Sequence, residues 1–122
     1  RVRRIAIADS SPAFLHAAAS YISNLPGYVV AGTSHTEQQA LTLVDSAGPD
    51  VLLIDLGSQP VRGLEIVRRV KATPRAPVVV AMTLFHTPEA AAAASRAGAD
   101  ALVGKESFIA GLRDALARLF PQ

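Results

Sequence analysis

Two short apolar runs limit what this 122-residue chain can fold into: VLLID at Val51–Asp55 and VVVAM at Val78–Met82. Both are rich in branched apolar residues and too short for a buried helix, which favours strands. A strand that is apolar at consecutive positions, and not only at every second one, has both faces covered. The two runs therefore predict the central strands of a parallel sheet with helices on both sides.

Strand-like and helix-like segments alternate along the whole chain. Proline and glycine separate them at Pro26-Gly27 and Gly48-Pro49, where turns are favoured. The expected strands are Arg4–Ala8, Tyr28–Gly32, Val51–Asp55, Val78–Met82 with Thr83 at its end, and Ala101–Gly104.

Capping residues predict where several helices begin. Ser11 and Thr87 are suitable N-caps, and each is followed by a proline at the first helical position, where a missing N–H costs nothing. Ser107 is expected to cap the last helix, whose inward residues would be Ile109, Leu112, Leu116 and Leu119. The other expected helices are Pro12 to about Leu25, Glu37–Ala47 with Ala40, Leu41 and Val44 inward, Leu64–Ala72, and Pro88–Ala97 closed by Gly98.

Five strand–helix units with short connections predict an α/β fold. The expected architecture is a flavodoxin-like (βα)5 doubly wound parallel sheet of strand order 2-1-3-4-5, formed by residues 1–122 as a single domain. In such sheets the ligand site lies at the carboxyl ends of the strands, where the strand order reverses. This places the expected site between the first and third strands.

Composition excludes several kinds of protein. The chain has no cysteine, which rules out disulfides, a thiolate nucleophile and a cysteine-based zinc site. It has no signal-like start and no apolar run near the roughly 18 residues of a membrane span, so we expect a soluble, cytoplasmic protein. The net charge of +2 does not favour direct nucleic-acid binding, and the basic residues are expected on solvated faces. They gather at Arg1, Arg3 and Arg4 and at Arg62, Arg68, Arg69, Lys71 and Arg75.

Four polar residues stand at the ends of expected strands: Asp9, Asp55, Thr83 and Lys105. Because the strands are parallel, all four ends meet at one edge of the sheet. Two carboxylates in such a cleft repel each other unless a cation or a proton compensates them. Lys105 and a hard divalent ion such as Mg²⁺, bound through oxygen ligands, would supply that cation.

At these residues the chain resembles the receiver domain of two-component response regulators, and the resemblance covers nearly its whole length. Asp55 matches the phosphoacceptor, Thr83 the switch hydroxyl and Lys105 the lysine after the fifth strand. The stretch AGADALVGK fits the family closely, and Gly63 fits the glycine that opens the third helix.

The resemblance implies that Asp55 accepts a phosphoryl group from a histidine kinase or a phosphotransfer protein, in a transfer and later hydrolysis that the domain itself catalyses. It implies Mg²⁺ bound by Asp9, Asp55 and the Gly57 carbonyl. It also implies that Thr83 reshapes a protein-binding face of the fourth helix, fifth strand and fifth helix, which could form a homodimer. No helix-turn-helix segment follows the last helix, so we expect action through partners or as part of a longer regulator.

Several positions depart from the family pattern. Ser10 replaces an acidic residue that normally contacts the metal, so we expect weak Mg²⁺ binding with Ser10 as a doubtful ligand. Leu84 replaces a small residue, Leu102 replaces an aromatic one, and Pro60 is displaced by one position. These changes leave open an alternative, a degenerate receiver that acts as a phosphorylation-independent protein-interaction module.

Other phosphate-related folds fit the sequence less well. GADALVGK has one residue too many for a phosphate-binding loop, and Glu106 stands where a hydroxyl should bind Mg²⁺. A flavin phosphate would be repelled by Asp9, and a dehalogenase-type phosphatase needs a second aspartate where Ser11 stands. The histidines, His16, His35 and His86, lack metal-ligand spacing.

Overall fold

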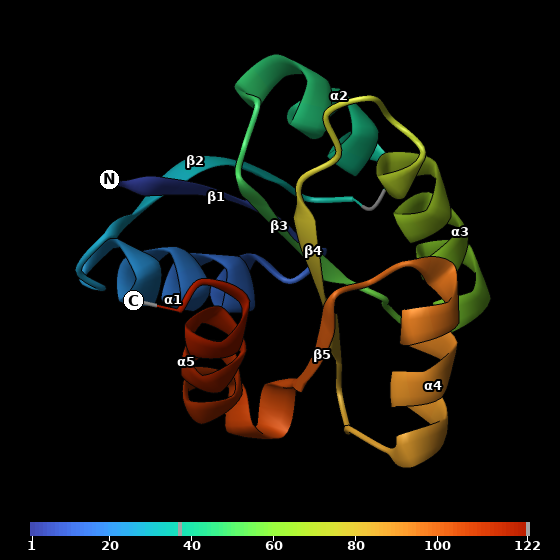
Figure 1. The fold of residues 1–122 in the computed structure, drawn as a ribbon. Coiled ribbons are helices and arrows are strands. Elements are labelled where there is room, and N and C mark those ends of the chain that lie inside the picture. The colour runs from blue at the N-terminus through green and yellow to red at the C-terminus, as the bar shows by residue number, and fades with distance from the viewer. Residues whose placement is uncertain (37, 122) are drawn as a thin grey trace.

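The computed structural model, which describes residues 1–36 and 38–121, contains one parallel sheet of five strands in the order β2-β1-β3-β4-β5 (Figure 1). This confirms the predicted fold class and strand order. The strands are β1 (Arg3–Ala8), β2 (Tyr28–Ser34), β3 (Val51–Asp55), β4 (Val78–Thr83) and β5 (Ala101–Gly104).

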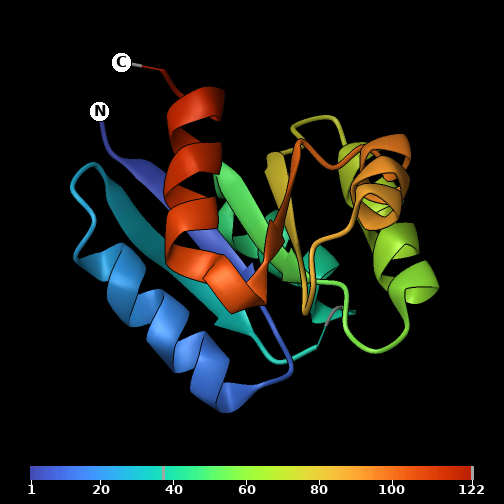
Figure 2. The same cartoon turned by 90° about the horizontal axis from the view of Figure 1, so that it is seen from below.

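The helices form two layers that cover both faces of the sheet. Figures 1 and 2 show α1 and α5 on one face and α2, α3 and α4 on the other. None of the helices in the described ranges is long and apolar enough to cross a membrane. Their bounds are α1 (Pro12–Ser23), α2 (Gln39–Ala47), α3 (Pro60–Lys71), α4 (Pro88–Ala97) and α5 (Phe108–Leu119), with a 3-10 turn at Lys105–Ser107.

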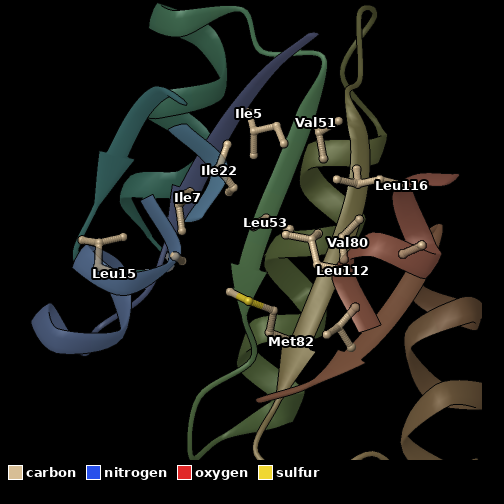
Figure 3. Packing of buried hydrophobic residues seen from close by; sticks show 13 residues of the cluster. Ile5, Ile7, Leu15, Ile22, Val51, Leu53, Val80, Met82, Leu112 and Leu116 are labelled. Carbon is tan, nitrogen blue, oxygen red and sulfur yellow. The ribbon is translucent and has the colours of Figure 1, made fainter. Parts of the chain in front are cut away.

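Alternate residues of each central strand feed two separate hydrophobic cores. In β3, Val51 and Leu53 point to the α1/α5 side, whereas Leu52 and Ile54 point to the side of α2, α3 and α4. Figure 3 shows the first core, in which Leu15 and Ile22 of α1 and Leu112 and Leu116 of α5 pack on the sheet. All four β3 residues are fully buried, so the continuous apolar run VLLI has the physical cause that the sequence predicted.

Two carboxylates fix the opposite edge of the sheet, where β3 and β5 begin. Asp50 Oδ2 accepts a hydrogen bond from the Arg4 N–H at 2.8 Å, and Asp50 Oδ1 pairs with Arg1 at 2.9 Å. Asp100 Oδ2 accepts from the Val79 N–H and from Lys71 Nζ, both at 2.9 Å. These two acids are therefore occupied in joining neighbouring strands, and part of the basic residue set neutralises them.

The predicted start of α3 was wrong. The expected helix Leu64–Ala72 begins four residues earlier, at Pro60, so Gly63 lies inside the first turn and does not open the helix. Gln59 precedes the helix without a side-chain cap, which removed the usual signal of a helix start.

Smaller differences between prediction and structure occur in β1, which begins at Arg3, and in β2, which continues to Ser34. The expected first residue of α2, Glu37, lies outside the described residues, and the helix itself begins at Gln39.

The prediction for the last helix was wrong in two details. Ser107 makes no capping hydrogen bond and belongs to the 3-10 turn that precedes α5. Ile109, expected to face the core, is exposed, because the turn sets the helix so that Phe108, Leu112, Ala115 and Leu116 face inward. The caps of α1 and α4 are confirmed: Ser11 Oγ accepts from the Phe14 N–H, and Thr87 Oγ1 accepts from the Ala90 N–H.

Gly63→Ala is expected to destabilise the protein. A Cβ at this position would lie 2.8 Å from both the Cα and the carbonyl oxygen of Leu56, which is the residue after Asp55. Moving that backbone should cost about 1–3 kcal/mol, against a gain of up to about 1 kcal/mol from replacing glycine in a helix. Urea denaturation should show a net loss of about 1–2 kcal/mol in the free energy of unfolding.

Val61→Ala is the matched control on the same helix. Val61 is 80% exposed, so its truncation should change the free energy of unfolding by less than about 0.5 kcal/mol. A Gly63→Ala protein as stable as wild type would show that the loop after Asp55 can move away from α3 without cost.

Candidate functional site

The strand register brings the predicted site residues to one edge of the sheet. Ala8 pairs with Ile54, so the next residues, Asp9 and Asp55, follow neighbouring strands at the same level. At the other side of β4, Thr83 pairs with Gly104, and Lys105 comes directly after it. We call this edge, formed by the carboxyl ends of the strands, the carboxyl edge.

The ammonium group of Lys105 joins two of these strands. Its Nζ lies 2.7 Å from Asp9 Oδ2 and 3.3 Å from Asp55 Oδ1. The Asp9 side chain is fully buried, and the side chains of Lys105 and Asp55 are 15% and 13% exposed. Since charges interact more strongly where water is excluded, this shared ammonium largely offsets the repulsion between the two carboxylates.

The loop after β1 fixes the direction of Asp9. Asp9 Oδ1 accepts a hydrogen bond from the Ser11 N–H at 2.8 Å, and the Asp9 N–H continues the sheet by donating to the Ser34 carbonyl. Asp9 Oδ2 is also buried, but its contact with Lys105 lacks the geometry of a hydrogen bond. Among the described residues, the Lys105 ammonium is therefore the close polar partner of the oxygen that faces the site.

The other predicted residues lie at the same edge of the sheet, at a strand end or in the loops that follow the strands. Thr83 is half-buried at the end of β4, while Ser10 and Gly57 are exposed in the loops after β1 and β3. Gly57 has a φ of +72°, a conformation that favours glycine and turns the chain sharply after Asp55. Leu84 is 64% exposed beside Thr83.

The oxygen atoms at the carboxyl edge are of the kind that binds a magnesium ion, but few side chains provide them. Carboxylate and carbonyl oxygens are the ligands that Mg²⁺ prefers, and Asp9 Oδ2 is a buried oxygen without a hydrogen-bond donor. Over residues 1–36 and 38–121, no three histidine, cysteine or acidic side chains come together in a way that could hold a metal ion. Protein ligands would thus come from two carboxylates and the backbone.

Sequence reasoning missed two residues at the carboxyl edge. The Phe14 ring lies under the Lys105 ammonium, with 4.2 Å between Nζ and the ring centroid. Glu106 Oε2 accepts a hydrogen bond from the His86 N–H at 3.2 Å, which joins the loop after β5 to the loop after β4. Neither contact had a local signal, since both join residues far apart in the chain.

The α2/α3 side carries a hollow of about 550 Å³, lined by residues that include Leu41, Arg62, Ile66 and Arg69. None of its lining residues belongs to the carboxyl edge. This hollow is therefore separate from the charged side chains of the carboxyl edge.

Comparison with known proteins agrees with this architecture. Residues 5–117 match the family described as the response regulator receiver domain. A protein-glutamate methylesterase/protein-glutamine glutaminase of Myxococcus xanthus is 32% identical over 88% of this chain, and a putative transcriptional regulator of Pseudomonas aeruginosa is 25% identical over 89%. The chain spans only 31% and 52% of the lengths of these two relatives.

Solved structures show the same fold. A two-component response regulator of the LuxR family from Aurantimonas is 26% identical, with a TM-score of 0.87 over 98% of this chain and 85% of that one. The signal receiver domain of the response regulator NarL from Mycobacterium tuberculosis, 21% identical, gives a TM-score of 0.86 over 98% and 96% of the two chains. Together with the family match over most of its length, the charged carboxyl edge shows that this chain belongs to the response regulator receiver domain family.

Proposed function

We propose that Asp55 accepts a phosphoryl group from a phosphohistidine of a sensor kinase or phosphotransfer protein. The observation that carries this proposal is the shared ammonium of Lys105, which touches both Asp55 and the buried Asp9. It brings a pair of carboxylates together at the carboxyl edge, where one could act as nucleophile and both as cation ligands. No other described carboxylate pair shares a lysine in this way.

The reaction needs a nucleophile and compensation of charge. A carboxylate oxygen of Asp55 attacks phosphorus, the P–N bond to the histidine breaks, and its electron pair remains on the imidazole nitrogen, which then takes up a proton. Negative charge on the transferring oxygens would lie beside the Lys105 ammonium, which is 3.3 Å from Asp55 Oδ1. Lys105 can therefore exchange a carboxylate partner for a phosphoryl oxygen with a small movement.

Asp9, Asp55 and the Gly57 carbonyl would hold Mg²⁺, with Ser10 contributing at most a neutral hydroxyl. When bound, the ion would offset the charge that builds on the phosphoryl oxygens. Asp9 supports this role because it brings a fully buried carboxylate whose Oδ2 accepts no hydrogen bond. The glycine after Leu56 supports it by letting the backbone turn back toward the edge.

Phosphorylation would act on a protein-binding face formed by α4, β5 and α5. Thr83 is paired with Gly104, so a shift of the threonine toward a phosphoryl group acts directly on β5 and on the residue before Lys105. The Glu106–His86 hydrogen bond also ties the two loops that would have to move. Leu102 on β5 is partly buried. Because this residue is aliphatic, a change in the shape of the face would not involve the rotation of an aromatic ring at this position. This face is our candidate for partner binding or homodimer formation.

Ser10 favours a second candidate function, a phosphorylation-independent interaction module. Ser10 is exposed and neutral, so the site has two carboxylates, and Lys105 already contacts both. A site in which one lysine already pairs with both carboxylates could have a purely structural role and stabilise the carboxyl edge. The two candidates differ in whether Asp55 reacts.

Intact-mass spectrometry after incubation with acetyl phosphate and Mg²⁺ distinguishes them. We expect a single phosphoryl adduct on wild type and none on Asp55→Asn, because only Asp55 joins an accessible carboxylate to Lys105. Asp45→Asn, which removes an exposed carboxylate on α2, is the matched control and should retain the adduct. Unmodified wild type, even at high Mg²⁺, would favour the interaction module.

Ser10→Asp should strengthen magnesium binding. One added carboxylate near a divalent ion is worth several kcal/mol at surface-like dielectric values, so we expect the affinity to rise at least about tenfold. The measurement is a magnesium titration followed by the backbone amide resonances of Ser11 and Gly57.

Ser20→Asp, on the exposed side of α1, adds the same charge away from the carboxyl edge and should leave the affinity within about twofold of wild type. Equal affinities of wild type and Ser10→Asp would show that position 10 does not limit metal binding.

A further inference from the structure

The ammonium of Lys105 has a third neighbour besides the two carboxylates. Phe14, in the first turn of α1, places its ring centroid 4.2 Å from Nζ. A cation within about 6 Å of an aromatic face is attracted by the ring, more strongly when water is excluded. The Lys105 side chain is only 15% exposed, so water weakens this attraction less than it would at an exposed site.

Phe14 is itself held by one contact of its backbone and one contact of its ring. The Phe14 N–H donates to Ser11 Oγ at 3.2 Å, which fixes the start of α1. Its ring packs edge-to-face on Phe108, with centroids 4.9 Å apart, and Tyr21 packs on Phe108 in the same manner at 6.4 Å. Phe108 begins α5 directly after the 3-10 turn that contains Lys105. One aromatic cluster therefore includes the residue that follows this turn and also contacts the ammonium of the lysine.

We infer that Phe14 is a positioning residue that holds the Lys105 ammonium between Asp9 and Asp55; its effect on phosphorylation rests on the function proposed above. A lysine stem has many rotamers, and an ion pair without directed hydrogen bonds does not select one of them. Asp9 Oδ2 lacks such a hydrogen bond, and Ser10 adds no charge. The ring closes the remaining side, so that the ammonium can reach a phosphoryl oxygen without leaving the site.

Phe14→Leu and Phe14→Tyr test this role in two ways. The first readout is the rate of adduct formation at saturating Mg²⁺ as the acetyl phosphate concentration is varied. The leucine variant should lower the maximal rate roughly 3- to 30-fold, the range that a lost cation–π contact corresponds to, with the half-saturating concentration little changed. The tyrosine variant retains an aromatic face and should stay close to wild type.

The second readout does not depend on phosphorylation. The side-chain methylene protons of Lys105, assigned with the help of Lys105→Met, should show an upfield ring-current shift in wild type and Phe14→Tyr that disappears in Phe14→Leu. If wild type takes up no phosphoryl group, the proposed function is overturned, and this NMR result alone decides the position of the lysine.

Phe120→Leu provides a matched control. Its ring also carries a cation, the Arg3 guanidinium at 4.0 Å from the centroid, but it lies near the start of β1 and thus at the opposite edge of the sheet. This variant should change neither the Lys105 resonances nor the rate. An unshifted lysine in wild type, or equal slowing by Phe14→Leu and Phe120→Leu, would overturn the inference.

Discussion

Helices cover both faces of the sheet, and this constraint determines how the strands pair and where the site residues lie. The backbone groups of β1, β3 and β4 can be paired only with neighbouring strands, because no water reaches the buried faces. The resulting parallel register fixes which residues follow the strands side by side, and it sets Asp9 beside Asp55 and Thr83 beside Gly104. The carboxyl edge is thus a direct product of the fold, and its chemistry depends on a few residues just beyond the strand ends.

The two edges of the sheet use similar residues for different purposes. At the opposite edge, Asp50 and Asp100 accept hydrogen bonds from the backbone of neighbouring strands and form ion pairs that are partly open to solvent. At the carboxyl edge, Asp9 and Asp55 share one enclosed ammonium, and a buried oxygen of Asp9 lacks a hydrogen bond. The first pair of carboxylates joins strands, whereas the second gathers around a single ammonium at the ends of the strands.

Sequence reasoning predicted the sheet because its signals are local. Consecutive apolar residues in VLLI and VVVAM, capped helix starts at Ser11 and Thr87, and breaks at Gly48-Pro49 each indicate an element without reference to the rest of the chain. It failed where local signals were absent or ambiguous. Pro60 begins α3 without a capping side chain. The 3-10 turn at Lys105–Ser107 sets the orientation of α5 so that Ile109 is exposed to solvent.

By itself, the sequence determined the five strand–helix units and the residues that end the strands, and it favoured the strand order that the structure shows, since right-handed parallel connections leave few other arrangements. From this, Asp9, Asp55, Thr83 and Lys105 could be assigned to one edge. Only the tertiary structure decided that one ammonium serves both carboxylates and that Phe14 lies beneath it. These contacts join residues that are far apart in the chain. Their distances depend on how the turn before α5 and the start of α1 pack together, which no local pattern encodes.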